Sequence, residues 1–164
     1  MPSERPGRPY NPPVPGTKLI TENRRARYDY HLLDRIEAGV QLTGTEVKSL
    51  RDGGAQLGQA YAEIRDGEAW LVGASISEYA GGNIANHRPE RDRKLLLHRR
   101  EIDSLYGKVR EKGLTLVPTR LYFKDGRVKV ELALARGKER IDKRRDLADR
   151  DAKRQMERAL KAHR

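Results

Sequence analysis

The segment Asn23-Arg-Arg-Ala-Arg-Tyr28 has a composition suited to binding RNA. It places three guanidinium groups, those of Arg24, Arg25 and Arg27, beside an amide and an aromatic ring. An arginine offers a planar fork of donors to phosphates and can stack on bases, and the amide of Asn23 can pair with base edges. We therefore predict that this segment contacts RNA.

Further along the chain, a basic loop at Arg88–Lys94 runs directly into the leucine triplet Leu95–Leu97. One of these leucines could point outward and pack on an unstacked base or a sugar; the alternative is that all three belong to the core. Three cations on the last predicted strand and its exit could extend one positive face, each contacting a phosphate. Taken singly, each of them is an ordinary solvated surface charge. They are Lys129, Arg136 and Lys138.

Residue patterns typical of catalysis are poorly represented. The four histidines are scattered, with no i, i+4 pair and no spacing typical of metal ligands. Cysteine is absent, which excludes disulfides, thiolate metal sites and cysteine nucleophiles. The common nucleotide-binding, hydrolase and metalloprotease motifs are missing as well. We expect a protein that is not an enzyme and has no metal or cofactor, although a nuclease built from separated carboxylates needs no local motif and stays open.

The charge of the chain is strongly positive and unevenly distributed. The net charge is +11 over 164 residues; residues 1–27 carry +4, residues 28–135 carry +1 and residues 136–164 carry +6. Basic ends around a nearly neutral body favour a polyanionic partner, because a phosphate that meets Lys or Arg releases counterions. The simpler alternative is a pair of solubilising tails. No membrane span or signal peptide is evident, so we expect a soluble, cytoplasmic protein with no membrane partner.

Two hairpins and two helices can be predicted between these basic ends. Asp66-Gly67 and Asp125-Gly126 each separate two apolar runs, which is a strong hairpin signal. The capping-box pattern Thr43–Glu46 begins one short helix, and a stripe of apolar residues over Ile102–Val109, closed by Gly113, indicates a second. Five or six short strands with two inserted helices predict a mainly β fold, an OB-like closed antiparallel β-barrel.

The composition divides the chain into three parts. Residues 1–17 hold six of the eight prolines and are expected to form a disordered extension, residues 18–138 form the barrel, and residues 139–164 form a basic tail. The tail has a thin apolar stripe at helical spacing, too weak to hold an isolated helix in water. We expect it to be disordered when free and helical against RNA, with a helix docked on the barrel as the alternative. The stripe consists of Ala148, Ala152, Met156, Ala159 and Leu160.

Several longer blocks of sequence occur in a fixed order between Glu22 and Arg144. Their order and spacing resemble the SsrA-binding protein (small protein B) family, and a match over most of the chain is far more specific than any single motif. The blocks are Asn23–Tyr30, Glu37–Gly39, Leu42–Arg51, Arg93–His98, Gly113–Pro118, Ala135–Lys138 and Asp142–Arg144.

This resemblance implies an OB-type barrel that binds the tRNA-like part of transfer-messenger RNA. With elongation factor Tu, such a protein brings the RNA to ribosomes stalled without a codon. It stands in there for the missing anticodon arm, while its tail enters the decoding site and messenger channel as a helix. We expect a monomer. The alternative within the binding class is another OB-type translation factor or ribosomal protein.

The resemblance also implies roles for single residues. Asn23, Arg24 and Arg25 would contact the RNA elbow, and Glu37 would pair with or position an RNA-facing group, since an acidic residue can accept hydrogen bonds from base amino groups. The residues implied for RNA binding are Asn23, Arg24, Arg25, Arg27, Glu37, Lys48, Arg51, Lys94, Leu96, His98, Lys129, Arg136 and Lys138. Those implied for the ribosome-directed tail are Ile141, Asp142, Lys143, Arg144, Met156 and Leu160.

Three features depart from the family pattern. Ile141 stands where relatives often carry His or Tyr, so an apolar contact would have to replace stacking on a decoding-centre base. Glu139 interrupts a run that is usually basic, which should weaken phosphate binding locally. The proline-rich start before Thr17 matches no part of the pattern.

Overall fold

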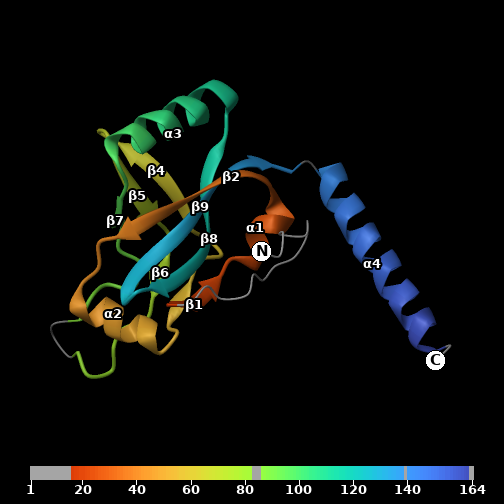
Figure 1. Cartoon of the computed structure of the whole chain (residues 1–164), viewed down its shortest axis with the longest axis horizontal. Helices are drawn as coiled ribbons and strands as arrows, with labels where there is room; N and C mark the ends of the chain where they lie inside the picture. Colours follow the sequence, from red (N-terminus) through yellow and green to blue (C-terminus); the bar gives the residue numbers. More distant parts are fainter. Residues whose placement is uncertain (1–15, 83–85, 139, 163–164) are drawn as a thin grey trace.

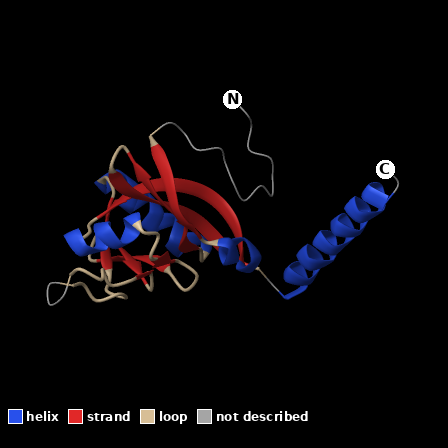
Figure 2. Cartoon of the chain, turned by 90° about the horizontal axis from the view of Figure 1, so that it is seen from below, coloured by secondary structure: helices blue, strands red, loops and turns tan. Residues whose placement is uncertain are grey.

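The chain forms a body of β-strands with a helix at each end of it and one long helix that projects away (Figure 1). The computed structural model describes residues 16–82, 86–138 and 140–162. The predicted proline-rich extension therefore lies outside the described residues, except for its last two positions. Seen from below, the strands curve around a common interior, and the long helix stands apart from them (Figure 2).

The main sheet is antiparallel throughout and its pairings run in a ring. Pairing passes from β8 through β4, β5, β7, β2 and β9 and returns to β8. Strand β1 is not part of this ring and pairs with the second half of β8. One pair, Ala62 with Leu116, joins β4 to β8. The strands are β1 (Thr17–Glu22), β2 (Tyr30–Val40), β4 (Tyr61–Arg65), β5 (Glu68–Val72), β7 (Arg93–Leu96), β8 (Thr115–Lys124) and β9 (Arg127–Gly137), with β3 (Ala55–Gln56) and β6 (Ser75–Ile76) as a separate pair.

The mainly β, antiparallel architecture predicted from the sequence is confirmed, whereas the predicted number of strands was too small. Both hairpins form where Asp-Gly pairs were found. Asp66 and Gly67 have φ values of 51° and 75°, and Asp125 and Gly126 have values of 50° and 79°. Two consecutive positive φ angles are typical of the type I′ turn that matches strand twist. The strands that were not predicted are β1, which has no apolar alternation of its own, the four-residue β7, and the two-residue β3 and β6.

Both predicted helices are confirmed, and a third one precedes β2. Helix α2 (Gly44–Arg51) begins with the predicted capping box, in which the Thr43 amide donates to Glu46 Oε1 at 2.9 Å. Helix α3 (Arg99–Lys112) ends at Gly113, whose φ of 61° is left-handed. Helix α1 (Arg24–Asp29) was not predicted. It forms because the Asn23 side chain accepts from the Ala26 amide and so caps the first turn.

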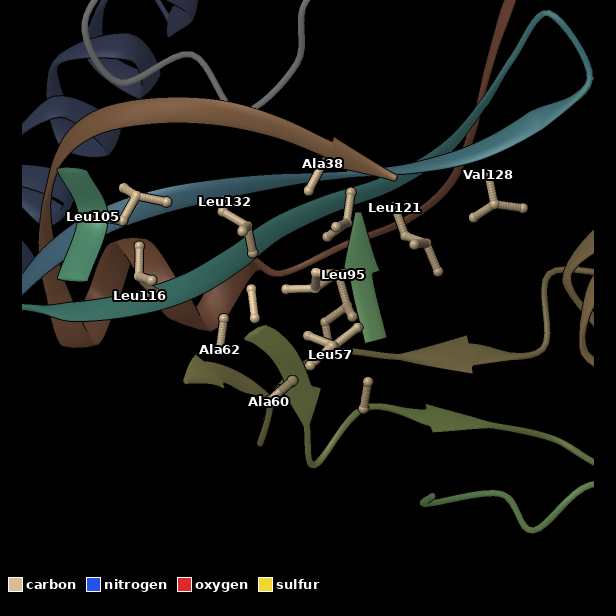
Figure 3. Close-up of a cluster of buried hydrophobic side chains, with 14 of the residues drawn as sticks. Ala38, Leu57, Ala60, Ala62, Leu95, Leu105, Leu116, Leu121, Val128 and Leu132 are labelled. Carbon is tan, nitrogen blue, oxygen red and sulfur yellow. The ribbon is translucent and has the colours of Figure 1, made fainter. Parts of the chain in front are cut away.

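Apolar side chains from all around the ring meet in one core (Figure 3). Val130 and Leu132 of β9 are fully buried, as the predicted alternation requires. A smaller apolar cluster lies on the outer side of β9, where Ala133 and Ala135 are also fully buried. Ala26 of α1 packs on these alanines, whose small side chains let the helix approach closely. Helix α1 therefore covers one end of the outer face of β9.

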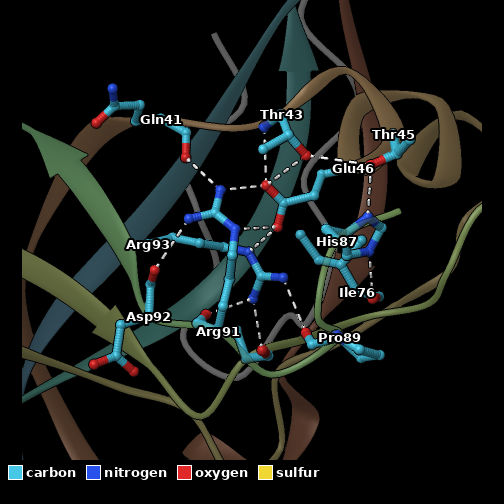
Figure 4. A network of polar contacts seen from close by, with 11 residues as sticks. Gln41, Thr43, Thr45, Glu46, Ile76, His87, Pro89, Arg91, Asp92 and Arg93 are labelled. Carbon is cyan, nitrogen blue, oxygen red and sulfur yellow. Dashed lines mark hydrogen bonds and ion pairs between the residues drawn. The ribbon is translucent and has the colours of Figure 1, made fainter. Parts of the chain in front are cut away.

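A buried ion cluster joins α2 to the first residue of β7 and the segment before it (Figure 4). Glu46 and Arg93 have no exposed surface, and Arg93 Nε donates to Glu46 Oε2 at 2.5 Å. Arg91 Nε donates to the same oxygen at 3.1 Å, and the Arg93 guanidinium also reaches the carbonyls of Ala74 and Pro89. Two arginines of the basic loop are thus structural, a use that the sequence analysis did not foresee.

The C-terminal segment is a single helix, α4 (Arg140–Ala162), directed away from the strands (Figures 1 and 2). Its predicted stripe does not pack on the body, since Met156 and Leu160 are 67% and 68% exposed. Folding of this helix only on contact with RNA stays a prediction. In the part of the chain that the structure describes, no helix is both long and apolar enough to cross a membrane.

Candidate nucleic-acid interface

Outward-facing residues of five strands form one row across the body. In the register of the sheet, Leu96 of β7 lies opposite Gly39 of β2, and Gly39 lies opposite Lys129 of β9. Lys129 in turn lies opposite Tyr122 of β8, and Tyr122 opposite Leu19 of β1. At about 4.8 Å per strand, the row is about 19 Å wide. We call it the five-strand row.

Two β-bulges bring these residues to the same face. The register shifts on β2 between Leu32 and Arg35, and on β8 between Pro118 and Arg120. Each bulge adds a residue to one strand and so exchanges the inward and outward positions beyond it. As a result, Glu37 of β2 and Tyr122 of β8 face outward beside Lys129, which lies on a strand without a shift.

Leu96 is one of two exposed apolar ends of the row, and Leu19 is the other. Leu96 is 52% exposed, while its neighbour Leu95 is 1% exposed and belongs to the core. The prediction that one leucine of the triplet points outward is therefore confirmed. Gly39 lies beneath it, and a Cβ atom at this glycine would be 3.2 Å from Leu96 Cβ. The absence of a side chain at Gly39 lets Leu96 lie against the backbone of β2.

Glu37 is held beside the row by two residues of β8. The Tyr122 hydroxyl donates to Glu37 Oε2, and Lys124 Nζ lies 3.3 Å from each carboxylate oxygen. The hydrogen bond from Tyr122 is the main cause that lowers the pKa of Glu37, with Lys124 and Lys129 acting in the same direction against a partial burial that raises it. Glu37 is ionised at neutral pH, and its side chain remains 38% exposed, so it can accept further hydrogen bonds.

A second ion pair lies next to Glu37 on the same face. Glu131 of β9 stands opposite Glu37, and Arg120 Nη2 donates to Glu131 Oε1 at 2.9 Å. Burial opposes ionisation of Glu131, but hydrogen bonds from Arg120 and Thr119 outweigh it and hold the pKa of Glu131 below its ordinary value. Arg35 Nη1 is 3.8 Å from the same carboxylate. This acidic residue is therefore neutralised within the protein.

The arginines of α1 lie at the end of this face, where the helix covers β9. Arg24 and Arg25 are exposed, and Arg25 Nε lies 3.1 Å from Asp29, one turn later. Arg27 is partly exposed. Their accessibility is compatible with the predicted contacts with phosphates, which stay a prediction.

The Asn23 side chain is buried, contrary to the prediction that it contacts RNA. Asn23 is 7% exposed, and its side-chain nitrogen donates to the carbonyls of Leu57 at 3.2 Å and Pro118 at 2.8 Å. Its oxygen accepts from the Ala26 amide. The amide is engaged in fastening α1 to the body, so the predicted reading of base edges by Asn23 does not fit the structure.

Other residues assigned from the sequence, Lys48, Arg51, Lys94 and His98, are not brought into the row. Lys48 and Arg51 are exposed on α2, and Lys48 Nζ lies over the Tyr79 ring at 5.6 Å from its centre. His98 precedes α3, where its amide donates to Glu101 at 3.0 Å. Lys94 shares the outer side of β7 with Leu96 and approaches Glu68 at 3.4 Å.

The expected positive face along β9 does not form. Seven positions separate Lys129 from Arg136, which places them about 23 Å apart and on opposite sides of a strand. Arg136 is exposed near the end of β9, and the backbone amide of Lys138 donates to Asp29 of α1 at 2.9 Å. The two basic residues therefore belong to the exit toward α4, beside α1.

Of the predicted tail residues, Arg144, Met156 and Leu160 are exposed on α4. Ile141, Asp142 and Lys143 belong to the same helix, but their side chains lie outside what the structure describes. Within the described residues, no group of three or more His, Asp or Glu side chains could hold a metal ion.

The sequence analysis missed Tyr122, Lys124 and Leu19. Tyr122 could have been placed beside Lys129 from the Asp125-Gly126 turn. A two-residue hairpin loop pairs Lys124 with Arg127 and therefore, two positions further along each strand, Tyr122 with Lys129. No local signal places β1 next to β8, so Leu19 could not have been found in this way.

Comparison with known proteins agrees with the resemblance noted in the sequence. Residues 20–162 match the model of the family described as SmpB protein. An SsrA-binding protein of Thermobifida fusca is 60% identical over 149 residues, which cover 91% of this chain and 93% of the relative. One of Acidothermus cellulolyticus is 61% identical over 145 residues, covering 88% and 91%.

A solved structure points to the same family. The chain is similar to one described as "tmRNA-SmpB: a journey to the center of the bacterial ribosome", with a TM-score of 0.62 and 52% identity. The similarity covers 73% of this chain and 85% of that one. On the family match and the identity to these relatives, the chain belongs to the SsrA-binding protein (SmpB) family.

Proposed function

We propose that this protein binds the tRNA-like part of transfer-messenger RNA and delivers it to stalled ribosomes for trans-translation. The observation that carries the proposal is the five-strand row with Glu37 beside it, in a chain about 60% identical to SsrA-binding proteins. The solved relative, described as a tmRNA-SmpB assembly in the ribosome, supports the same partners.

The chemistry of the row suits a folded RNA better than a plain duplex. Lys129 and the arginines of α1 supply cations for phosphates, which give affinity without sequence preference. Glu37 is an acceptor, so it can pair with base amino groups or a 2′-hydroxyl but would repel a phosphate. Leu96 offers an apolar surface to an unstacked base or a ribose. A single face with these three properties favours an RNA that exposes both backbone and base edges, as a tRNA-like elbow does.

The tail serves the ribosomal part of the proposed function. Helix α4 has 23 residues and is about 35 Å long, so it can extend well beyond the body. We expect it to enter the decoding site and messenger channel while the body replaces the anticodon arm. The remaining parts of the proposal are delivery as a monomer together with elongation factor Tu, and action in the cytoplasm, where ribosomes are found.

The proposal includes the shape of the body. The antiparallel ring of six strands is proposed to be a closed, OB-like barrel with α2 and α3 inserted between strands. Strands β4 and β8 are joined by the single pair Ala62–Leu116, which is the shortest strand pairing in that barrel. In this arrangement the interior is filled by the core, and RNA is bound on the outside.

The test compares RNAs at one salt concentration. The protein should bind the tRNA-like domain of transfer-messenger RNA at least about 100-fold more tightly than a random duplex of equal length. Equal affinities for the two RNAs would contradict the proposal. The same samples with added Mg²⁺ test for an enzyme, since release of nucleotides from labelled RNA would favour a nuclease.

A further inference from the structure

The Glu37 carboxylate depends for its position on a strand that does not pair with its own. Glu37 lies on β2, but the groups that hold it, the Tyr122 hydroxyl and the Lys124 ammonium, both come from β8. Strand β9 lies between these two strands and supplies Lys129 and the neutralised Glu131 at the same level. A free glutamate side chain samples many rotamers, whereas this one accepts hydrogen bonds at both carboxylate oxygens.

We propose that β8 is part of the RNA interface and that Tyr122 is a positioning residue, which orients the Glu37 carboxylate to accept hydrogen bonds from RNA. The inference rests on the proposed function, since it assigns a further residue to the same RNA-binding face. Tyr122 contributes through Glu37, and its own ring needs no contact with a base.

The geometry leaves the carboxylate available for a ligand. A carboxylate has about four lone-pair positions, and Tyr122 occupies one of those on Oε2. Lys124 is equally far from both oxygens and its side chain is 44% exposed, so its ammonium balances the charge without enclosing the carboxylate. Oε2 therefore accepts from both groups, whereas at least one lone pair on Oε1 can meet a donor of the RNA.

Fixing the carboxylate before RNA arrives reduces the cost of binding. Immobilising a flexible side chain at an interface costs affinity, and a side chain that is already ordered avoids part of this cost. Removal of the Tyr122 hydroxyl should therefore weaken binding of transfer-messenger RNA by about 3- to 10-fold. It should also change the pH dependence of binding, because the hydrogen bond from Tyr122 is the main cause that lowers the pKa of Glu37.

The experiment is a double-mutant cycle with full-length protein and the tRNA-like domain of transfer-messenger RNA. Tyr122→Phe, Glu37→Ala and the double variant are compared by equilibrium binding, well below their melting temperatures. We expect Tyr122→Phe to weaken binding in the wild-type background and to have no further effect in the Glu37→Ala background. Additive losses would show that Tyr122 does not act through Glu37 and would overturn the proposal.

Two further measurements separate positioning from a merely structural role. Without the Tyr122 hydroxyl, the pKa of Glu37 should rise, so Glu37 takes up a proton at a higher pH. As the pH is lowered, Tyr122→Phe should therefore lose RNA affinity at a higher pH than wild type does. Superimposable pH profiles of the two proteins would contradict the proposal. Tyr106→Phe is the matched control, since it also removes a tyrosine hydroxyl that is hydrogen-bonded to a charged residue. Tyr106 lies on α3, where its hydroxyl accepts from Arg110 at 3.3 Å. This control should bind RNA like wild type.

The result can be distinguished from failure of the proposed function. If wild type does not prefer transfer-messenger RNA and Glu37→Ala binds as well as wild type, the proposed RNA face itself is wrong. If wild type is selective and Glu37→Ala is weak, but Tyr122→Phe binds normally, only the positioning role is overturned.

Discussion

Replacing Glu46 by glutamine would remove the negative charge from the buried ion cluster while keeping the size of the side chain. In the native chain Arg93 has no exposed surface, and Glu46 is its acidic partner. Glutamine can still accept from the Thr43 amide at the start of α2, but it cannot neutralise a buried guanidinium. Uncompensated charges of this kind cost about 3–5 kcal/mol. For a body of this size, we expect the melting temperature to fall by roughly 10–20 °C.

The matched control for this change is Glu101→Gln. Glu101 has the same position in the capping box of α3, where it accepts from the His98 amide at 3.0 Å, but no buried arginine depends on it. The control should cost about 1 kcal/mol or less. Thermal unfolding followed by circular dichroism measures both variants. If Glu46→Gln is no more destabilising than Glu101→Gln, the reasoning about the buried charge is refuted.

The pH dependence gives an independent check. Burial opposes ionisation of Glu46, but hydrogen bonds from Arg91, the Thr43 amide and Arg93 outweigh it, so the pKa of Glu46 lies below its ordinary value of 4.5. A carboxyl whose pKa is lower in the folded than in the unfolded state stabilises the fold above the ordinary pKa. This contribution is lost as the pH falls through the folded value. The difference in stability between wild type and Glu46→Gln should therefore shrink below about pH 4.5.

Four further predictions concern RNA binding, the stability of the body and the tail. Leu96→Ala should weaken binding of transfer-messenger RNA several-fold in a filter assay and leave the melting temperature unchanged, because the side chain is half exposed. If the melting temperature falls together with the affinity, Leu96 is a core residue. Gly39→Ala should weaken binding in the same assay, since the new Cβ displaces Leu96. Asn23→Ala should lower the unfolding free energy by about 1–3 kcal/mol, measured in urea, because buried carbonyls lose their donor. A chain that ends at Lys138 should keep its RNA affinity but lose tagging of stalled products, and normal tagging would refute the role of α4.

The proposed RNA-binding face also illustrates why charge alone is a poor guide to a binding site. Of the cations assigned from the sequence, Lys129 lies in the five-strand row, Arg136 and Lys138 lie at the exit toward α4, and Lys48 lies on α2. The row combines a lysine, a tyrosine and two exposed leucines, and an acid, Glu37, lies beside it. Selectivity for a folded RNA is expected from such a mixture, because phosphate contacts position a protein while acceptors and apolar groups recognise exposed bases and sugars.

Local sequence determined the elements whose stabilising contacts are close in the chain. The two Asp-Gly turns, the capping box of α2 and the glycine that ends α3 each depend on residues no more than a few positions apart, and all were predicted. The alternation of β9 correctly placed Val130 and Leu132 in the core. The family blocks, read in order, also indicated the RNA partner and the importance of Glu37 and Leu96.

Tertiary structure alone decided which side chains meet. The Asn23 amide donates to Pro118, 95 positions away, and Tyr122 reaches Glu37 across 85 positions. The contact between Tyr122 and Glu37 depends on the bulges in β2 and β8, each of which exchanges the inward and outward positions beyond it. A bulge is stabilised by pairing with a distant strand, so its position has no reliable signature in the local sequence. For this reason the sequence could indicate that Glu37 and Lys129 bind RNA, but only the register of the sheet shows that they share a face with Tyr122.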